Sequence, residues 1–207
     1  HARMTLSRGL KSTSGMDPRL NVHGSTLIIL PEYKGMVYGD EGTRLVTAST
    51  RRNSPATLDS KIHHNNLLNN ILAKIEANVA GVDDAVMLDV RGFIAETNAT
   101  NIFVVRSGVL MTPFPVACLP GLTRSMVLDV AARIGIPAVE ADLSLTELYT
   151  ADEAFTTGTM GGLSHMREVD GRLIGPSDAM GPITLKLQEA YQQMVWDEGH
   201  PLAYCSL

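Results

Sequence analysis

At Gly81 the spacing of apolar residues changes, and this change limits the possible folds more than any other feature of the chain. Before Gly81, apolar residues recur every three or four positions, which predicts a helix with Gly81 at its C-cap. The recurring residues are Leu67, Leu68, Ile71, Leu72, Ile75 and Val79. From 85 to 112, short apolar runs separated by Arg91-Gly92 and Ser107-Gly108 predict an antiparallel meander of strands.

Further helices and strands follow without regular alternation. Helices are predicted from about Thr123 to Gly135, after the capping-box pattern Ser144-x-x-Glu147, and from Pro182 onward. Strands are predicted at 26–30, 44–50 and 153–157. This mixture favours an α+β architecture over a doubly wound parallel sheet. A length of 207 residues fits one large domain with a smaller piece.

Composition excludes several classes of function. A net charge of −5 and a pI near 5.6 argue against a nucleic-acid or anionic-membrane partner. The only cysteines, Cys118 and Cys205, rule out a disulfide scaffold and a cysteine-based zinc site, and they fit a reducing, cytoplasmic compartment. No apolar run reaches the ~20 residues that cross a bilayer. The adjacent pair His63-His64 has no nearby cysteine or carboxylate cluster, so no metal site is predicted.

Two segments in the middle of the chain carry candidate chemistry. Lys61 lies between a β-rich stretch and the first helix, where a desolvated amine could act as a nucleophile; the alternative is a solvated surface lysine. Glu96 closes an apolar strand ahead of the polar loop 97–101. A partly buried carboxylate there needs a partner, for which a protonated ring nitrogen is one candidate, and the alternative is a glutamate that caps the loop.

Two later segments could bind anions. Leu119 to Arg124 combines Pro, Gly and Thr immediately before a helix, where free N–H groups and a hydroxyl can cradle a phosphate. Thr156 to Gly162 is a strand that runs into a Gly-rich turn, and it could form a second anion-binding nest. Taken separately, each segment could also be an ordinary helix start or turn.

Taken together and in this order, the four segments resemble those of the class IV aminotransferases, which are pyridoxal-phosphate enzymes of fold-type IV. The resemblance runs from about Arg3 to about Trp196 and is most specific from Lys61 to Gly162. The branched-chain amino acid aminotransferases are most similar, and Gly92–Phe103 and Leu119–Arg124 carry most of that similarity. The resemblance implies a fold-type IV large domain with a partial small α/β domain.

By this resemblance, Lys61 is the catalytic lysine, which binds pyridoxal 5′-phosphate covalently and moves a proton during the reaction. Aligning on the following helix would place His63 there instead, but only a primary amine can form that bond. Relatives have an asparagine three or four residues after the lysine, and Asn65 lies four after it. Many branched-chain enzymes have a tyrosine next, where this chain has Asn66.

Other residues are implied to hold the cofactor. Glu96 resembles the carboxylate that keeps the pyridine nitrogen protonated, so that the ring can accept electrons. Leu122 and Thr123 resemble the backbone and hydroxyl contacts to the phosphate, and Thr159 resembles its second hydroxyl. Asn101 is expected to support the strand that carries Glu96.

The resemblance also divides the chain. It implies that 1–35 is a remnant of a small N-terminal domain, 36–43 an interdomain linker and 44–207 the large cofactor-binding domain. The linker region from Pro31 to Gly42 holds one Pro, three Gly and two Tyr.

Because the chain begins at what reads as an interior strand, we expect it to lack the start of the small domain. We also expect residues 1 to about 35 to be the least stable part of the chain. Relatives draw a phosphate-binding arginine from the small domain; Arg51 and Arg52 could help near the phosphate, or be surface charge only.

The implied function is transamination between a branched-chain L-amino acid and 2-oxoglutarate by a homodimer or higher homo-oligomer. The substrate carboxylate is expected at the backbone of Thr159, Met160 and Gly161. The alternatives are a D-amino acid aminotransferase, an aminodeoxychorismate lyase, or a truncated cofactor-binding protein with little turnover.

Overall fold

The computed structural model describes residues 1–33, 35, 38, 41–176 and 179–199. It divides the chain into two compact units, His1–Met36 and Val37–Leu207. Of the expected linker 36–43, positions 36, 37, 39 and 40 lie outside the described residues, as does Cys205.

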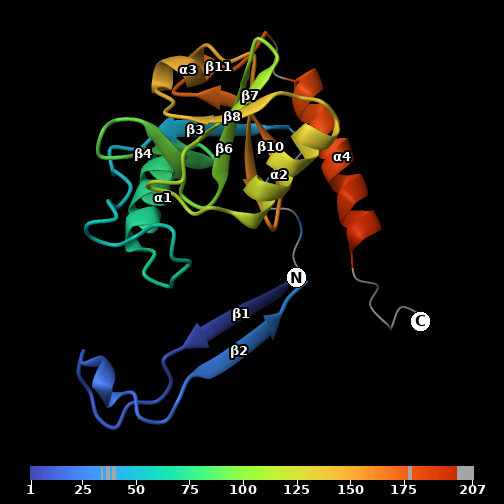
Figure 1. The fold of residues 1–207 in the computed structure, drawn as a ribbon. Coiled ribbons are helices and arrows are strands. Elements are labelled where there is room, and N and C mark those ends of the chain that lie inside the picture. The colour runs from blue at the N-terminus through green and yellow to red at the C-terminus, as the bar shows by residue number, and fades with distance from the viewer. Residues whose placement is uncertain (34, 36–37, 39–40, 177–178, 200–207) are drawn as a thin grey trace. The chain divides into compact units, whose positions relative to one another are not determined.

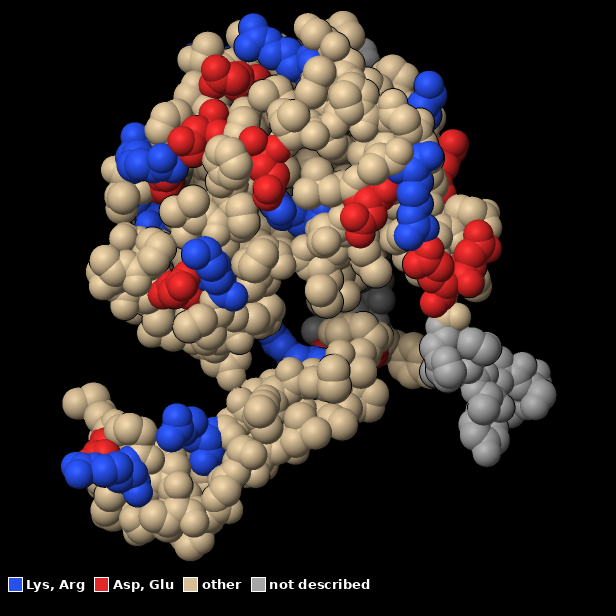
Figure 2. Space-filling model, in the orientation of Figure 1, with Lys and Arg blue, Asp and Glu red and all other residues tan. Residues whose placement is uncertain are grey.

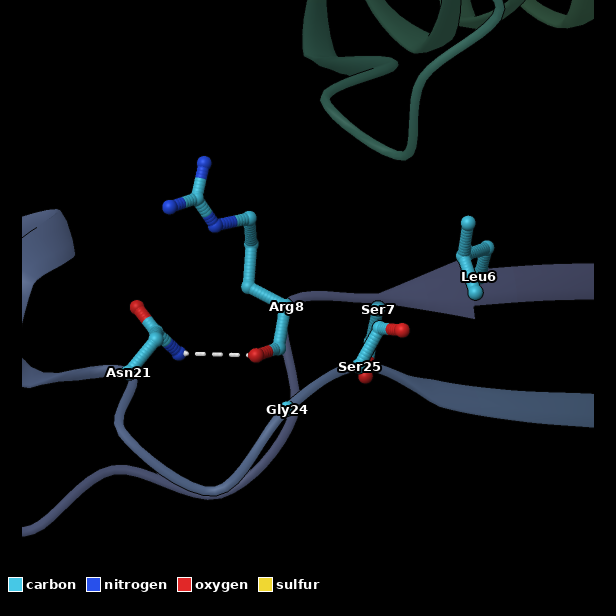
Figure 3. Close-up of a pocket in the computed structure, with 6 residues that line it drawn as sticks. All are labelled: Leu6, Ser7, Arg8, Asn21, Gly24 and Ser25. Atoms are coloured by element: carbon cyan, nitrogen blue, oxygen red, sulfur yellow. Dashed lines mark hydrogen bonds between the residues drawn. The ribbon is translucent and has the colours of Figure 1, made fainter.

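The first unit is a β-hairpin. Strands β1 (Ala2–Ser7) and β2 (Thr26–Pro31) pair antiparallel, and the loop between them contains the short 3-10 helix η1 (Pro18–Leu20). The large apolar side chains of both strands are exposed, while Lys and Arg gather toward the loop end of the hairpin (Figure 2). Where the strands meet that loop, the Asn21 carboxamide donates to the Arg8 carbonyl beside a shallow hollow of about 340 Å³ (Figure 3). A pair of strands with this much exposed apolar surface is marginally stable by itself.

The second unit contains the remaining elements (Figure 1). Its strands are β3 (Thr43–Thr47), β4 (Asp84–Leu88), β5 (Ile94–Thr97), β6 (Asn101–Arg106), β7 (Val109–Pro113), β8 (Ala138–Ala141), β9 (Glu153–Gly158), β10 (Gly162–Val169) and β11 (Arg172–Leu173). Its helices are α1 (Leu68–Ala80), α2 (Leu122–Arg133), α3 (Leu145–Tyr149) and α4 (Pro182–Glu198). The α+β prediction is confirmed, and the helices begin close to the predicted positions.

The strands form one mixed sheet in the order β5-β4-β3-β10-β9-β6-β7-β8, with β11 paired to β10. The predicted continuous meander is wrong. Hairpins β4–β5 and β6–β7 do form, but β3, β10 and β9 lie between them in the sheet. The reason is non-local: β3 pairs in parallel with both β4 and β10, which local spacing cannot reveal. The sheet curls so that β5 also contacts β6.

Side chains on successive residues of a strand point to opposite faces of the sheet. Alternate side chains of β6 therefore pack into two different hydrophobic clusters, one on each face. Ile102 and Val104 pack into one cluster together with α3, whereas Phe103 and Val105 pack into the other with α2 and α4. The Phe103 ring stacks on Phe155 of β9 with their centroids 5.1 Å apart. The curled sheet is therefore covered on both faces, and the strand ends between α1 and α2 are left to carry polar residues.

Helix α1 contacts the sheet through small residues. Ala73 and Ala77 pack on Ala85 and Met87 of β4, whereas the larger aliphatic residues that predicted the helix are exposed. Gly81 ends the helix in a left-handed conformation, as predicted. None of the helices that the structure describes is long and apolar enough to span a membrane.

Candidate active site

Glu96 is the centre of the polar cluster at the end of β5. The Arg52 Nε donates to Glu96 Oε1 at 2.6 Å, and both side chains are about 94% buried. The backbone N–H of Leu119 donates to the other carboxylate oxygen at 3.2 Å. Glu96 is therefore a buried carboxylate with a cationic partner, as the sequence indicated, but the partner within this chain is an arginine.

Helix α1 holds Arg52 in place. Asn69 accepts a bond from Arg52 Nη1 through its Oδ1 and donates from its Nδ2 to the carbonyl of Arg51. Further along the helix, the Glu76 carboxylate accepts the backbone N–H groups of Ser49 and Thr50. The helix thus fixes the whole segment that leads into Arg52.

The structure corrects the expectation for Arg52. Sequence reasoning placed it near a phosphate or on the surface, whereas it is buried against Glu96. The only sequence signal for Arg52 was its position after a strand and before the Lys61 segment. Its pairing with Glu96 joins residues 44 positions apart, which local sequence patterns cannot show.

Burial raises the pKa of Glu96 to about 6, and the Arg52 guanidinium opposes that rise. Desolvation disfavours the charged form of a carboxyl, while a neighbouring cation favours it. Near neutral pH the group is an anion held in a site of low polarity. Such an anion can stabilise a second cation, such as a protonated ring nitrogen.

Asn101 connects this carboxylate to the start of α2. Its carboxamide donates to the Leu119 carbonyl at 2.8 Å, and Leu119 in turn donates to Glu96. A Cβ at Gly121 would lie 2.3 Å from Asn101 Oδ1, so the close approach requires glycine there. The expected support for Glu96 thus runs through the backbone of Leu119.

The start of α2 has the form of an anion cradle. Gly121 is the N-cap and gives no side-chain cap to the helix, so first-turn N–H groups have no partner inside the helix. Leu122 is exposed, whereas the side chain of Thr123 is buried. A free helix N-terminus with an adjacent hydroxyl suits a phosphate.

The β9–β10 hairpin contributes the third group of candidates. Gly161 donates to the Gly158 carbonyl to close the turn, which leaves Thr159 and Met160 exposed at its tip. Thr157 belongs to the candidate segment 156–162, but the sequence did not single it out as a site residue. It pairs with Asn101 across β9 and β6, so both side chains stand on the same face of the sheet.

Lys61 lies in the irregular segment between β3 and α1. Its side chain is exposed, and its backbone N–H bonds to Asp59 Oδ1. The Ser60 hydroxyl donates to the carbonyl of Asn53, which follows Arg52. The chain around Lys61 is therefore tied to the Arg52 segment, but no hydrogen bond among the described residues links the Lys61 amine to Glu96.

Three buried polar atoms lack a partner among the described residues: Thr157 Oγ1, His64 Nδ1 and Asn70 Oδ1. Such orphans cost about 1–3 kcal/mol each, so they mark places where a further group can bond. Thr157 lies on the same face of the sheet as Asn101, and Asn101 bonds to Leu119 just before the start of α2. The buried carboxylate, the free helix N-terminus and the unpartnered Thr157 hydroxyl fit a phosphorylated pyridine cofactor. Within the described part of the chain, no three His, Cys, Asp or Glu residues cluster in a way that could hold a metal.

Comparison with known proteins identifies the family. Residues 1–169 match the family described as amino-transferase class IV. The chain belongs to this family. Its fold is that of fold-type IV, because it superposes on solved branched-chain aminotransferases at more than 30% identity.

Two relatives show how far the similarity extends along the chain. It is 55% identical to branched-chain-amino-acid aminotransferase-like protein 2 of Arabidopsis thaliana over 98% of its length, and 40% identical to a putative branched-chain-amino-acid aminotransferase of Methanocaldococcus jannaschii over 94%. It covers 36% of the first protein and 67% of the second.

A solved structure shows the same extent. The T.th. branched-chain amino acid aminotransferase complexed with N-(5'-phosphopyridoxyl)-L-glutamate aligns with a TM-score of 0.85 at 32% identity. The alignment covers 94% of this chain and 63% of that one. The chain thus spans about a third of the plant relative and about two thirds of the other two proteins.

Proposed function

We propose that the protein is a pyridoxal 5′-phosphate-dependent aminotransferase. The observation that carries the proposal is the buried Glu96 carboxylate, held by Arg52 and linked through Leu119 and Asn101 to the free N-terminus of α2. A ring nitrogen and a phosphate on one small molecule would find both partners there. The solved relative that holds a phosphopyridoxyl amino acid supports the same interpretation.

In this proposal Glu96 pairs with the protonated pyridine nitrogen, while the Leu122 backbone and the hydroxyls of Thr123 and Thr159 contact the phosphate. Asn101 keeps the intervening loop in position through its bond to Leu119. The cofactor supplies an electron sink for the substrate's Cα electrons when it is bound. The anionic Glu96 sustains that property, because it keeps the ring nitrogen charged.

Lys61 is proposed as the catalytic residue. Its primary amine would bind the cofactor covalently and, once the substrate amine has displaced it, would move the proton between the substrate Cα and the cofactor's C4′. The turn of Thr159, Met160 and Gly161 is proposed to hold the substrate carboxylate through backbone N–H groups. The exposure of Thr159 and Met160 leaves this turn accessible to a substrate.

We propose a branched-chain L-amino acid and 2-oxoglutarate as substrates. The names of the plant and archaeal relatives and of the solved T.th. structure support this choice. The names of these relatives point away from D-amino acid transfer and from aminodeoxychorismate cleavage. A cofactor-binding protein with little turnover is the remaining alternative.

The division of the chain belongs to the same proposal. Residues 1–35 are proposed as part of a small N-terminal domain and 44–207 as the large cofactor-binding domain, and the two compact units are consistent with this division. The protein is further proposed to be a homo-oligomer of the cytoplasm. The free, buried Cys118 fits a reducing compartment.

The test has two stages on the purified chain. Borohydride reduction after incubation with pyridoxal 5′-phosphate, followed by peptide mapping, is expected to place the label on Lys61. Label on Lys74 would overturn the assignment, and Lys61→Arg should lose the label while Lys74→Arg keeps it. A screen of L-Leu, L-Ile, L-Val, D-Ala and D-Glu with 2-oxoglutarate then identifies the substrate. Turnover restricted to D-amino acids would overturn the substrate proposal, and label without turnover would favour the cofactor-binding alternative.

A further inference from the structure

A polar pocket of about 270 Å³ lies in the second unit, around the start of β3. Strand β3 pairs with both β4 and β10, so its first residues lie between Asp83, directly before β4, and Arg167 of β10. Tyr38 and Glu41, which precede β3, complete the wall. The described residues that line this pocket include none of those proposed above for the cofactor or the substrate. The pocket is therefore a separate site.

Two opposite charges in this pocket have no partner within the described part of the chain. The side chains of Arg167, which is partly buried, and Glu41, which is exposed, form no hydrogen bond or ion pair there, with each other or with other residues. The other two charged residues of the wall already bond within the chain. Arg44 Nη2 donates to the Gly81 carbonyl at 3.0 Å, and Asp83 Oδ2 accepts the Arg44 backbone N–H at 2.8 Å. A gap between two unpaired opposite charges suits a ligand that carries both charges itself.

Gly42 brings the two charges to the same pocket. Its backbone has a φ of +80°, and a Cβ there would lie 2.2 Å from Nε2 of the buried His165 on β10. This close approach therefore requires glycine. Because Glu41 adjoins Gly42 and His165 lies two residues before Arg167, the contact holds the chain at Glu41 against the strand that carries Arg167.

We propose that this pocket binds a small zwitterion, an α-amino acid, with its carboxylate on Arg167 and its ammonium on Glu41. A guanidinium can donate two parallel N–H bonds to a carboxylate, and such charge-assisted hydrogen bonds are stronger than neutral ones. Pockets for drug-sized ligands have about 300–1,000 Å³, so this smaller volume restricts the ligand to a small molecule. The inference goes beyond the proposed function, because the proposed substrate site lies elsewhere.

Tyr38 adds a fixed apolar wall to the pocket. Its hydroxyl donates to Asp84 Oδ2 at 2.5 Å, and Asp84 is buried at the start of β4. The bond leaves the Tyr38 ring to contact a ligand, and an aromatic ring favours an apolar side chain. Because the ring is already held in place, its ordering costs the ligand little affinity. L-Leu, which combines both charges with an aliphatic side chain, is therefore the probe.

Equilibrium dialysis of the full chain with radiolabelled L-Leu measures binding without turnover. The wild type is expected to bind L-Leu, and Arg167→Gln and Glu41→Gln should each weaken that binding at least tenfold, because each removes one charge-assisted contact. The matched controls are Arg106→Gln, at the exposed end of β6, and Glu168→Gln, which neighbours Arg167 but does not line the pocket. Both controls should keep the wild-type affinity.

Two analogues test the need for both charges. 4-Methylpentanoate lacks the ammonium and 3-methylbutylamine lacks the carboxylate, so each should compete with labelled L-Leu at least tenfold more weakly than unlabelled L-Leu does. Competition by 4-methylpentanoate as strong as that by L-Leu would show a site for simple anions and would overturn the proposal.

Lys61→Arg separates this pocket from the proposed active site. It should keep L-Leu binding while it loses the cofactor label, whereas the two pocket variants should keep the label. Absence of L-Leu binding by the wild type, or wild-type affinity in both pocket variants, would overturn the proposal and leave the proposed function untouched. Far-UV circular dichroism checks folding, and if Arg167→Gln does not fold, Glu41→Gln at its exposed position decides the outcome.

Discussion

Arg52 Nε lies 2.6 Å from Glu96 Oε1, in a pair that joins the start of the Lys61 segment to the end of β5. Both partners are buried, and each has a second bond: Arg52 to Asn69 and Glu96 to Leu119. The pair therefore fixes two chain segments relative to each other and sets the charge of the site.

Removing the cation should destabilise the protein strongly. Arg52→Met leaves the Glu96 carboxylate buried without its partner, and breaking one half of a buried pair costs about 3–5 kcal/mol. Urea unfolding at pH 8 measures the loss. The control is Arg133→Met, which removes an exposed, solvent-screened pair with Glu198 and should cost far less stability. Equal losses in the two variants would contradict the role given to Arg52.

The pH dependence of stability should reveal the Glu96 carboxyl. Its pKa is raised to about 6 by burial, above the 4.5 of an unperturbed glutamate, so the folded chain binds this proton more tightly than the unfolded chain. The stabilisation is complete below about pH 4.5 and is lost as the pH rises through 6. Unfolding free energies of wild type and Glu96→Gln, compared from pH 4 to 8, should diverge by about 1–2 kcal/mol in that window. A difference that is independent of pH would show that Glu96 does not titrate there.

The same substitution separates binding from chemistry. Glu96→Gln is expected to retain the cofactor, because the phosphate contacts remain, but to slow proton transfer from the substrate. Each 1.36 kcal/mol of lost stabilisation lowers the rate about tenfold. Stopped-flow absorbance of the half-reaction with L-Leu gives the rate. A half-reaction as fast as that of the wild type would assign Glu96 another task.

Thr157 should contribute to cofactor binding although the sequence did not single it out. Its hydroxyl is buried without a partner among the described residues, and a hydrogen bond to a charged group is worth about 1.5–3 kcal/mol. Thr157→Val should therefore weaken the binding of pyridoxal 5′-phosphate about tenfold or more in an absorbance titration, while binding of pyridoxal, which lacks the phosphate, should change little. Thr156→Val is the matched control, since the Thr156 hydroxyl faces away and bonds to the Ser164 carbonyl. Equal effects of the two variants would exclude a phosphate contact at Thr157.

The sequence by itself determined the local elements. The spacing before Gly81, the Ser144–Glu147 capping box and the Pro182 helix start all reappear in the structure, because each depends on residues within one or two turns. The order of Lys61, Glu96 and the two turns was enough to indicate the family.

Only the tertiary structure decided what those elements do together. The pairing of β3 with β4 and β10 split the predicted meander, because strand pairing joins residues as distant in the chain as Leu45 and Val169. Arg52, expected near the phosphate or as surface charge, is buried as the partner of Glu96. The fold leaves the aliphatic residues whose spacing predicted α1, such as Ile75, exposed rather than packed on the sheet. Spacing shows that a helix has an apolar face, but only the fold shows whether its own sheet covers that face.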